Sequence, residues 1–192
     1  MKLVRTDLPG VLVVEPAIFG DDRGWFMESF NETRWMAALQ EAGEPVPRRF
    51  VQDNHSCSQA GVLRGLHYQL PPHAQGKLVR VVQGAAFDVA VDIRKGSPHF
   101  GRWTGVLLDA DNRRQLWIPE GFAHGFLALS DNTHFLYKTT DVYSRECERS
   151  IRWDDPALAI VWPAVAAGSK LAAKDAAAPL LAAADHPEWS GG

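Results

Sequence analysis

The chain has 192 residues, of which 46 % are hydrophobic and 22 % charged, as is ordinary for one soluble globular domain. Its 20 basic and 23 acidic residues give a net charge of −3, which is too balanced to predict binding to nucleic acid or to an anionic membrane surface. Two distant cysteines, Cys57 and Cys147, and the lack of a signal-peptide or membrane-spanning apolar run predict a cytoplasmic protein without a disulfide framework.

Short strands dominate the pattern along the chain. In order, the apolar runs predict strands over residues 11–14, 49–53, 62–69, 78–83, 85–94, 103–109, 125–129 and 133–139. The clearest alternation lies in 85–94, where Phe87, Val89, Val91 and Ile93 fall on one face. Turn-forming residues such as Gln83-Gly84 and Asp131-Asn132 separate these runs, so the sequence predicts an all-β sandwich or barrel.

Helices are expected at two places around this β-structure. The first covers residues 32–42, with Asn31 as its cap and Trp35, Met36 and Leu39 facing inward. The second is the alanine-rich stretch 164–184, which favours short helices interrupted at Pro179. We expect a single domain over residues 1–184 and a flexible tail over 185–192.

Two histidine motifs resemble the paired motifs of cupin barrels. They are residues 61–69 (GVLRGLHYQ) and 119–125 (PEGFAHG). Metal-binding cupins end the first motif with His-x-His and a following glutamate, whereas this chain has His67, then Gln69, and no glutamate before Gly84. Because a tight metal site needs several converging ligands, we expect the barrel to hold no metal. Alone, His67 and His124 could equally be structural histidines.

Longer stretches carry a more specific resemblance. They are residues 21–30 (DDRGWFMESF), 50–56 (FVQDNHS), 63–69 (LRGLHYQ), 75–80 (QGKLVR), 87–94 (FDVAVDIR), 115–119 (QLWIP), 137–140 (YKTT), 153–156 (WDDP) and 174–175 (KD). In this order, and over about residues 3 to 181, the chain resembles the dTDP-4-dehydrorhamnose 3,5-epimerase family of dTDP-rhamnose biosynthesis. The resemblance implies a mainly β fold, a cupin or jelly-roll barrel (double-stranded β-helix) with a few short peripheral helices.

The resemblance also implies the chemistry. The hydrogens on C3 and C5 of a 4-keto sugar lie next to the ketone, so inversion needs a base, a group that holds the enolate and an acid on the opposite face. By correspondence, His67 is the base, Tyr137 the acid, Asp175 the partner of the base, and Lys77 the group that holds the enolate and binds substrate. Asp175 could instead cap the last helix. No cofactor is needed, and the chain lacks a glycine-rich dinucleotide fingerprint.

Further residues correspond to the family's substrate-binding positions. The arginine and glutamate near the N-terminus are Arg23 and Glu28, the cations suited to a diphosphate are Arg64 and Lys174, and the second-motif histidine is His124. The rest are the triplet Gln52, Asp53 and Asn54, and the acidic residue Glu148, for which Glu146 is a possible substitute. Strict strand alternation would place Arg64 and His67 on opposite faces, so either Gly65 forms a bulge or Arg64 approaches from another direction.

The expected reaction converts dTDP-4-dehydro-6-deoxy-D-glucose into dTDP-4-dehydro-L-rhamnose, and the resemblance implies a homodimer. A relative that inverts only C3 or only C5 would keep the same motifs, so single-position epimerisation of a related dTDP-4-keto-6-deoxy sugar remains an alternative. Two others are a metal-dependent cupin enzyme, against which Gln69 argues, and a non-catalytic sugar-binding barrel, which gives no reason to combine His67, Lys77 and Tyr137.

Overall fold

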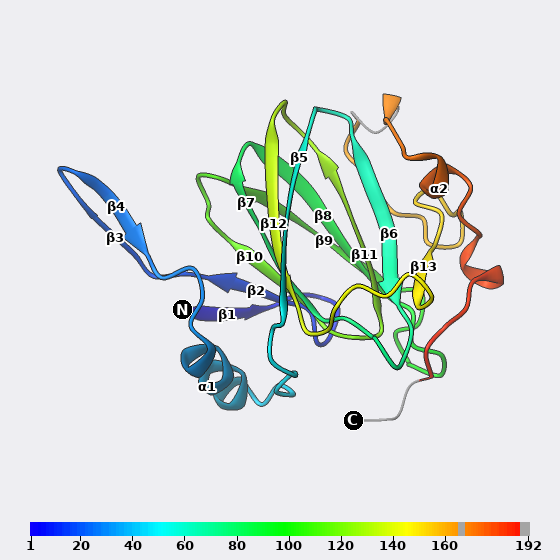
Figure 1. The fold of residues 1–192 in the computed structure, drawn as a ribbon, viewed down its shortest axis with the longest axis horizontal. Coiled ribbons are helices and arrows are strands. Elements are labelled where there is room, and N and C mark those ends of the chain that lie inside the picture. Colours follow the sequence, from blue (N-terminus) through cyan, green and yellow to red (C-terminus); the bar gives the residue numbers. More distant parts are fainter. Residues whose placement is uncertain (165–167, 189–192) are drawn as a thin grey trace.

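Two antiparallel sheets face each other in the computed structural model, which describes residues 1–164 and 168–188 (Figure 1). One sheet contains, in spatial order, β1 (Lys2–Arg5), β2 (Leu12–Glu15), β10 (Gln115–Ile118), β7 (Lys77–Gln83), β12 (Thr133–Thr139) and β5 (Gln52–Ser58). The other contains β13 (Glu148–Ser150), β6 (Leu63–Gln69), β11 (Phe122–Ala128), β8 (Ala85–Asp92) and β9 (Trp103–Asp109). The chain passes repeatedly between the sheets, which is the jelly-roll barrel that the sequence predicts.

The alternation of β8 determines which side chains fill the barrel. Ala86 and Ala90 point inward and join the core between the sheets, together with aromatic side chains such as Phe126 and Phe135. The opposite face of the strand carries Val89 and Val91, which pack outside the barrel. The predicted apolar face of 85–94 is confirmed, and it lies on the outside, where the C-terminal segment covers it.

Helix α1 (Glu32–Ala42) has the predicted bounds and cap. The Asn31 side chain accepts a hydrogen bond from the Arg34 amide at 3.1 Å, and the helix ends at Gly43, which has a φ of 71°. Trp35 and Leu39 are fully buried against the outer face of the six-stranded sheet. The cap and the apolar stripe are therefore enough to fix this helix from the sequence.

Several strands differ from the prediction. The strand expected over 49–53 begins only at Gln52, and the one expected over 125–129 begins already at Phe122. Strands β1, β10 and β13 were not predicted. All four residues of β10 are buried because the strand lies between β2 and β7, so it shows no alternation for a sequence pattern to detect.

A hairpin of β3 (Ile18–Asp21) and β4 (Gly24–Met27) was also not predicted, and it extends away from the barrel (Figure 1). Its large apolar side chains are unusually open: Phe19 is 66 %, Trp25 54 % and Phe26 67 % exposed. Singly exposed apolar residues are normal, but three large ones on one projecting hairpin set this part of the chain apart from the rest of the fold.

The C-terminal segment lies against the five-stranded sheet. It contains the short helix α2 (Ala173–Ala176) and the 3₁₀ turn η2 (Leu181–Ala183), with Pro179 between them, as the alanine-rich composition predicts. Residues 185–188, which we assigned to a loose tail, contact the barrel instead: the Asp185 carbonyl accepts a hydrogen bond from Tyr68, and Lys95 pairs with Glu188. Residues 189–192 of that tail lie outside the described residues. Of the described residues, none belongs to a helix long and apolar enough to cross a membrane.

Candidate active site

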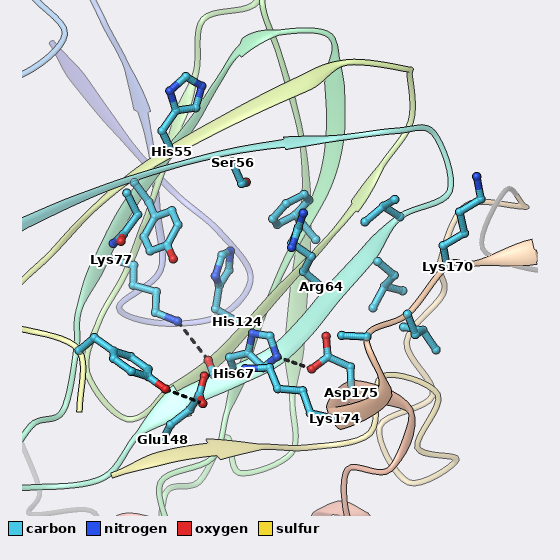
Figure 2. Close-up of a pocket in the computed structure, with 18 residues that line it drawn as sticks. His55, Ser56, Arg64, His67, Lys77, His124, Glu148, Lys170, Lys174 and Asp175 are labelled. Atoms are coloured by element: carbon cyan, nitrogen blue, oxygen red, sulfur yellow. Dashed lines mark hydrogen bonds and ion pairs between the residues drawn. The ribbon is translucent and has the colours of Figure 1, made fainter. Parts of the chain in front are cut away.

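A cavity of about 570 Å³ opens between the two sheets (Figure 2). Strands β5, β6, β7, β11 and β12 form its walls, and β13 and α2 close one side. We call it the main cavity. Of the predicted site residues, it brings together Asn54, Arg64, His67, Lys77, His124, Tyr137, Glu148, Lys174 and Asp175.

The shortest contact between these residues joins His67 on β6 to Asp175 on α2. His67 Nε2 lies 2.6 Å from Asp175 Oδ1, and the second carboxylate oxygen accepts a 3.4 Å hydrogen bond from the Gly65 amide. Burial opposes ionisation of Asp175, but the hydrogen bond and charge of His67 outweigh it and hold the pKa of this carboxyl below its ordinary value. The residue at the N-cap of α2 is Ala172, so the helix-cap alternative for Asp175 is wrong.

Gly65 explains how Arg64 and His67 both reach the main cavity. In the pairing of β6 with β11, His67 lies opposite His124 and Arg64 opposite Phe126, so β6 contains one extra residue at a bulge. Gly65 has a φ of 130°, and a Cβ atom there would lie 2.5 Å from the Gly125 Cα. Only glycine fits this close approach, and of the two predicted alternatives the bulge is the one observed.

Lys77 places an ammonium group next to the His67 strand. It is the first residue of β7 and only 7 % exposed, and its Nζ donates a 3.2 Å hydrogen bond to the His67 carbonyl (Figure 2). Burial lowers the pKa of Lys77 to about 8, although the negative charges of Asp88 and Glu148 oppose the shift. The amine therefore loses its charge at a much lower pH than an exposed lysine, around pH 8.

His124 forms a second histidine–carboxylate pair, with a partner that sequence reasoning missed. Its Nε2 lies 2.7 Å from Oδ1 of Asp88 on β8, and both side chains are buried. Burial raises the pKa of Asp88 and lowers the pKa of His124, in each case against the attraction of the partner. The sequence did contain a signal for Asp88. It is an acidic residue in the predicted strand 85–94, on the face opposite the apolar Phe87 and Val89.

Tyr137 contributes a protonated hydroxyl to the main cavity. The residue lies on β12, paired with Asn54 of β5 and Val79 of β7, and its side chain is half-buried. Burial raises the pKa of the Tyr137 hydroxyl above its ordinary value, while Arg64 opposes the shift. At neutral pH the group can therefore donate a proton but cannot act as a base.

Glu148 connects two other residues at the side of the cavity. Its Oε1 pairs with Lys174 Nζ at 2.8 Å, and its Oε2 accepts a 3.1 Å hydrogen bond from the Tyr143 hydroxyl (Figure 2). Burial disfavours the ionised form, but these two donors outweigh it and lower the pKa of Glu148. Glu146, the possible substitute, is exposed and does not line the main cavity, and Tyr143 was not among the predicted site residues.

Cations surround the open part of the main cavity. Arg64 donates to Ser58 Oγ at 3.2 Å, and Lys174 and Lys170, the second of which sequence reasoning also missed, line the cavity at separate places (Figure 2). These cations outnumber the two carboxylates, Glu148 and Asp175, that line the same space. The arrangement suits an anionic ligand such as a diphosphate.

Four predicted binding residues lie elsewhere. Arg23 on the hairpin pairs with Asp21, and Glu28 binds Asn31 and Arg34. On β5, the Asp53 side chain points away from Asn54 and binds Lys138 at 2.8 Å. Gln52 lines a smaller cavity of about 130 Å³, which shares His67, Lys77, Tyr137 and Tyr143 with the main cavity and is called here the small cavity.

Within residues 1–164 and 168–188, no three His, Cys, Asp or Glu side chains gather closely enough to hold a metal ion. The predicted first-motif position for a second metal ligand holds Gln69, whose amide binds backbone groups. The polar side chains that line the main cavity are therefore groups that can transfer protons, together with cations.

The fold and this cavity together define an isomerase-type sugar epimerase built on a cupin-like barrel. The sequence profile described as dTDP-4-dehydrorhamnose 3,5-epimerase matches residues 5–183. The chain belongs to the dTDP-4-dehydrorhamnose 3,5-epimerase family.

Individual relatives agree with this assignment. The chain is similar to the dTDP-4-dehydrorhamnose 3,5-epimerase of Shigella flexneri, with 60 % identity over 163 residues that cover 85 % of this chain and 87 % of the relative. It is 56 % identical to that of Salmonella typhimurium, covering 94 % and 96 % of the two chains. A crystal structure of dTDP-6-deoxy-D-glucose-3,5-epimerase from Legionella pneumophila in complex with dTDP-4-keto-L-rhamnose superposes with a TM-score of 0.91, at 50 % identity and 99 % coverage of both chains.

Proposed function

We propose that this enzyme inverts C3 and C5 of dTDP-4-dehydro-6-deoxy-D-glucose, giving dTDP-4-dehydro-L-rhamnose without a metal or cofactor. The observation that carries the proposal is the His67–Asp175 pair, which faces the same cavity as Lys77 and Tyr137. A base, a cation and a protonated hydroxyl around one space are the groups that enolate chemistry requires. The relatives above carry the same activity in their names.

In this mechanism the two nitrogens of His67 have different tasks. Nε2 is held by the Asp175 carboxylate at 2.6 Å, which leaves Nδ1 to accept the proton from the sugar carbon. The buried carboxylate fixes the orientation of the ring and stabilises the imidazolium that forms. Asp175 is suited to this task because its lowered pKa keeps it ionised when His67 takes up the proton.

The enolate and the returning proton need the other two groups. Lys77 is buried beside the His67 strand, and in its charged form it stabilises negative charge on the C4 oxygen. Tyr137, protonated at neutral pH, returns a proton to the face opposite His67. The buried His124–Asp88 pair lies next to His67 across the β6–β11 pairing, where His124 binds the sugar.

The nucleotide end of the substrate is assigned to the cationic rim. Arg64 and Lys174 bind the diphosphate, and Glu148 orients Lys174 through their 2.8 Å ion pair. The Asn54 side chain binds the ligand from the β5 wall.

We further propose a cytoplasmic homodimer in which the β3–β4 hairpin of one chain covers the cavity of the other. Arg23 and Glu28 correspond to binding positions of the family, yet both lie outside the main cavity of their own chain. The exposed Phe19, Trp25 and Phe26 supply an apolar surface for such a contact.

One incubation tests the reaction and its alternatives. The substrate is treated with enzyme in deuterated water, and NMR locates the label in the product. Deuterium at both C3 and C5 with inverted configuration supports the proposal, whereas inversion at one carbon only would assign the chain to single-position epimerisation. Binding without exchange would indicate a non-catalytic barrel, and activity that depends on added metal would indicate a metal-dependent enzyme.

A further inference from the structure

Gln69 lies next to His67, the proposed base, but has no part in the proposed proton transfer. It ends β6 two residues after His67, so both side chains lie on the same face of the strand, and Gln69 is 5 % exposed. This is the position of the second histidine in the metal-binding cupin motif. A buried carboxamide must bind other groups to offset its lost hydration, so its partners reveal its role.

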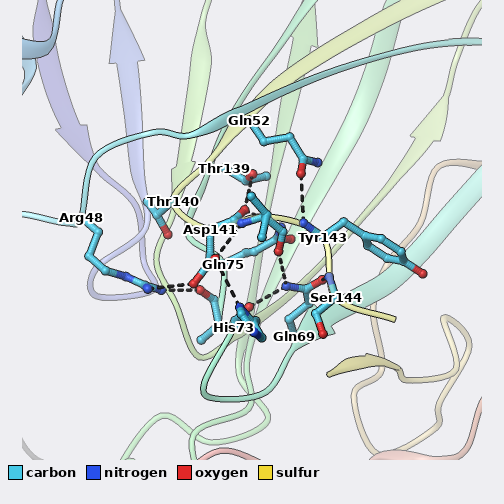
Figure 3. A network of polar contacts seen from close by, with 12 residues as sticks. Arg48, Gln52, Gln69, His73, Gln75, Thr139, Thr140, Asp141, Tyr143 and Ser144 are labelled. Carbon is cyan, nitrogen blue, oxygen red and sulfur yellow. Dashed lines mark hydrogen bonds and ion pairs between the residues drawn. The ribbon is translucent and has the colours of Figure 1, made fainter. Parts of the chain in front are cut away.

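Those partners all belong to two loops near the cavity (Figure 3). Gln69 Nε2 donates to the carbonyl oxygens of His73 at 2.5 Å and Val142 at 3.1 Å, and Oε1 accepts from the Ser144 amide at 2.8 Å. A backbone carbonyl can only accept a hydrogen bond and a backbone N–H can only donate one. These three partners therefore fix which end of the Gln69 carboxamide is oxygen and which is nitrogen. Both of its amide hydrogens are used, and the side chain joins the 70–76 loop to the segment between β12 and β13.

Two further glutamines bind the same segment. Gln52 Oε1 accepts a 2.9 Å hydrogen bond from the Tyr143 amide, and Gln75 Nε2 donates to the Asp141 carbonyl at 2.8 Å (Figure 3). Residues 141–144 are thus held through their backbone by side chains at the ends of β5 and β6 and in the 70–76 loop. This segment belongs to no strand, so side-chain hydrogen bonds hold it in place. Besides the glutamines, Arg48 and His73 bind the Asp141 carboxylate at the start of the segment, which leaves Gln69 as a contact of Val142 and Ser144 further along.

The position of this backbone matters because it carries Tyr143. The Tyr143 side chain lines both the main and the small cavity, yet it is 55 % exposed, so surrounding packing does little to fix it. Its hydroxyl reaches Glu148 at 3.1 Å, and Glu148 in turn holds Lys174. A shift of the 142–144 backbone would therefore move Tyr143 and break its hydrogen bond to Glu148, whose own backbone is held in β13 by the pairing with β6.

We infer that Gln69 is a positioning residue: it sets the 142–144 backbone and, through it, the Tyr143 side chain, whose hydroxyl orients the Glu148 carboxylate that binds Lys174. Gln69 lines the small cavity beside His67, but its hydrogen bonds go to the His73, Val142 and Ser144 backbone and not to the His67 ring, so it acts on ligand affinity rather than on proton transfer. A histidine could not replace it, since a neutral imidazole has one donor and one acceptor and cannot bind two carbonyls and an amide together. The inference rests on the proposed function in one respect, that a dTDP-linked sugar occupies the main cavity.

The test uses two variants of the full-length enzyme. Gln69→Glu keeps the shape but directs a carboxylate oxygen at two carbonyls, and Gln69→Met keeps the length but removes every hydrogen bond. Gln83→Glu, at the exposed end of β7, is the matched control. The measurements are KM and kcat, the Kd of dTDP by calorimetry, and hydrogen–deuterium exchange of residues 142–144 in the absence of ligand.

For both Gln69 variants we expect KM and the Kd of dTDP to rise about tenfold, kcat to stay within about twofold, and exchange to accelerate locally at 142–144. The control should match the wild type. Unchanged affinity and exchange, faster exchange over the whole chain, or a collapse of kcat at unchanged KM would each overturn the inference. So would a failure of both variants to fold, which would make Gln69 a core residue. A wild-type enzyme without turnover would instead reject the proposed function, while exchange and dTDP binding would still test Gln69.

Discussion

His67 Nε2 lies 2.6 Å from Asp175 Oδ1, although the two residues are 108 positions apart in the chain. The contact joins a barrel strand to a short helix near the C-terminus, and it fixes the orientation of the His67 imidazole. The proposed reaction depends on this pair more than on any other contact in the cavity.

The first prediction concerns that pair. We expect His67→Asn to lower kcat by about a hundredfold to ten-thousandfold, because it removes the proton acceptor, and Asp175→Asn to lower kcat by about a hundredfold or more, because the ring loses its charged partner. Steady-state kinetics measures both, with His99→Asn, in the loop after β8, as the control. Near-normal turnover by folded His67→Asn would refute the assignment of the base.

Tyr137 separates proton exchange from inversion. In Tyr137→Phe only the hydroxyl is lost, so His67 can still form the enolate and return the proton to the original face. We expect this variant to incorporate deuterium from solvent at C3 or C5 while forming inverted product much more slowly than the wild type. If inversion continues at the wild-type rate, Tyr137 is not the acid, and Tyr143, which also lines the main cavity, becomes the next candidate.

The buried Lys77 predicts how activity depends on pH. With a pKa of about 8, the amine loses its charge as the pH rises through that value, so kcat should fall on the alkaline side. Lys77→Arg keeps the charge and should move this fall to higher pH, whereas Lys77→Met should remove the dependence together with most activity. A pH–rate profile that is the same in the wild type and in Lys77→Arg would assign the alkaline limb to another group.

The same pKa makes a prediction about stability. The folded state releases the Lys77 proton near pH 8, but the unfolded chain holds it until about 10.5, so the unfolded state binds more protons between these values. The contribution of Lys77 to the free energy of unfolding should therefore increase as the pH rises from 8 to 10.5, which means that it makes the folded state more stable. Denaturant unfolding at several pH values checks this, and the contribution should be missing in Lys77→Met.

Mixed dimers test the proposed role of Arg23. Arg23→Ala and His67→Asn should each be weakly active alone at low substrate. If Arg23 completes the partner's cavity, a dimer containing one chain of each kind has one intact site, and random assortment should restore roughly a quarter of the wild-type activity. Co-expression followed by assay measures this. Activity no higher than the sum of the separate variants would show that Arg23 does not act across chains.

The metal-free mechanism predicts no effect of chelation. Gln69 stands where a metal ligand would be expected, and its amide is occupied by backbone groups. We expect no stoichiometric transition metal by elemental analysis and full activity after chelation. About one metal ion per chain, with activity lost on its removal and regained on its return, would contradict the mechanism.

Some parts of the fold were predictable because their signal is local. The cap of α1 and the alternation in β8 depend on spacings of a few residues, and both were predicted correctly. Strand β10 and hairpin β3–β4 were missed for opposite reasons: β10 is buried on both faces, whereas the hairpin exposes its apolar side chains. Neither follows the pattern of one buried and one solvated face.

The sequence by itself determined the family, the barrel class and the identity of most cavity residues, because the order of the motifs and the type of each residue can be read directly from the sequence. Only the tertiary structure decided which residues share the cavity. It added Asp88 and Lys170, separated Arg23 and Glu28 from their own chain's cavity, and placed Asp175 as the partner of His67. The physical reason is that hydrogen bonds and charge pairs act over a few ångströms, and the barrel brings together strands that are distant along the chain.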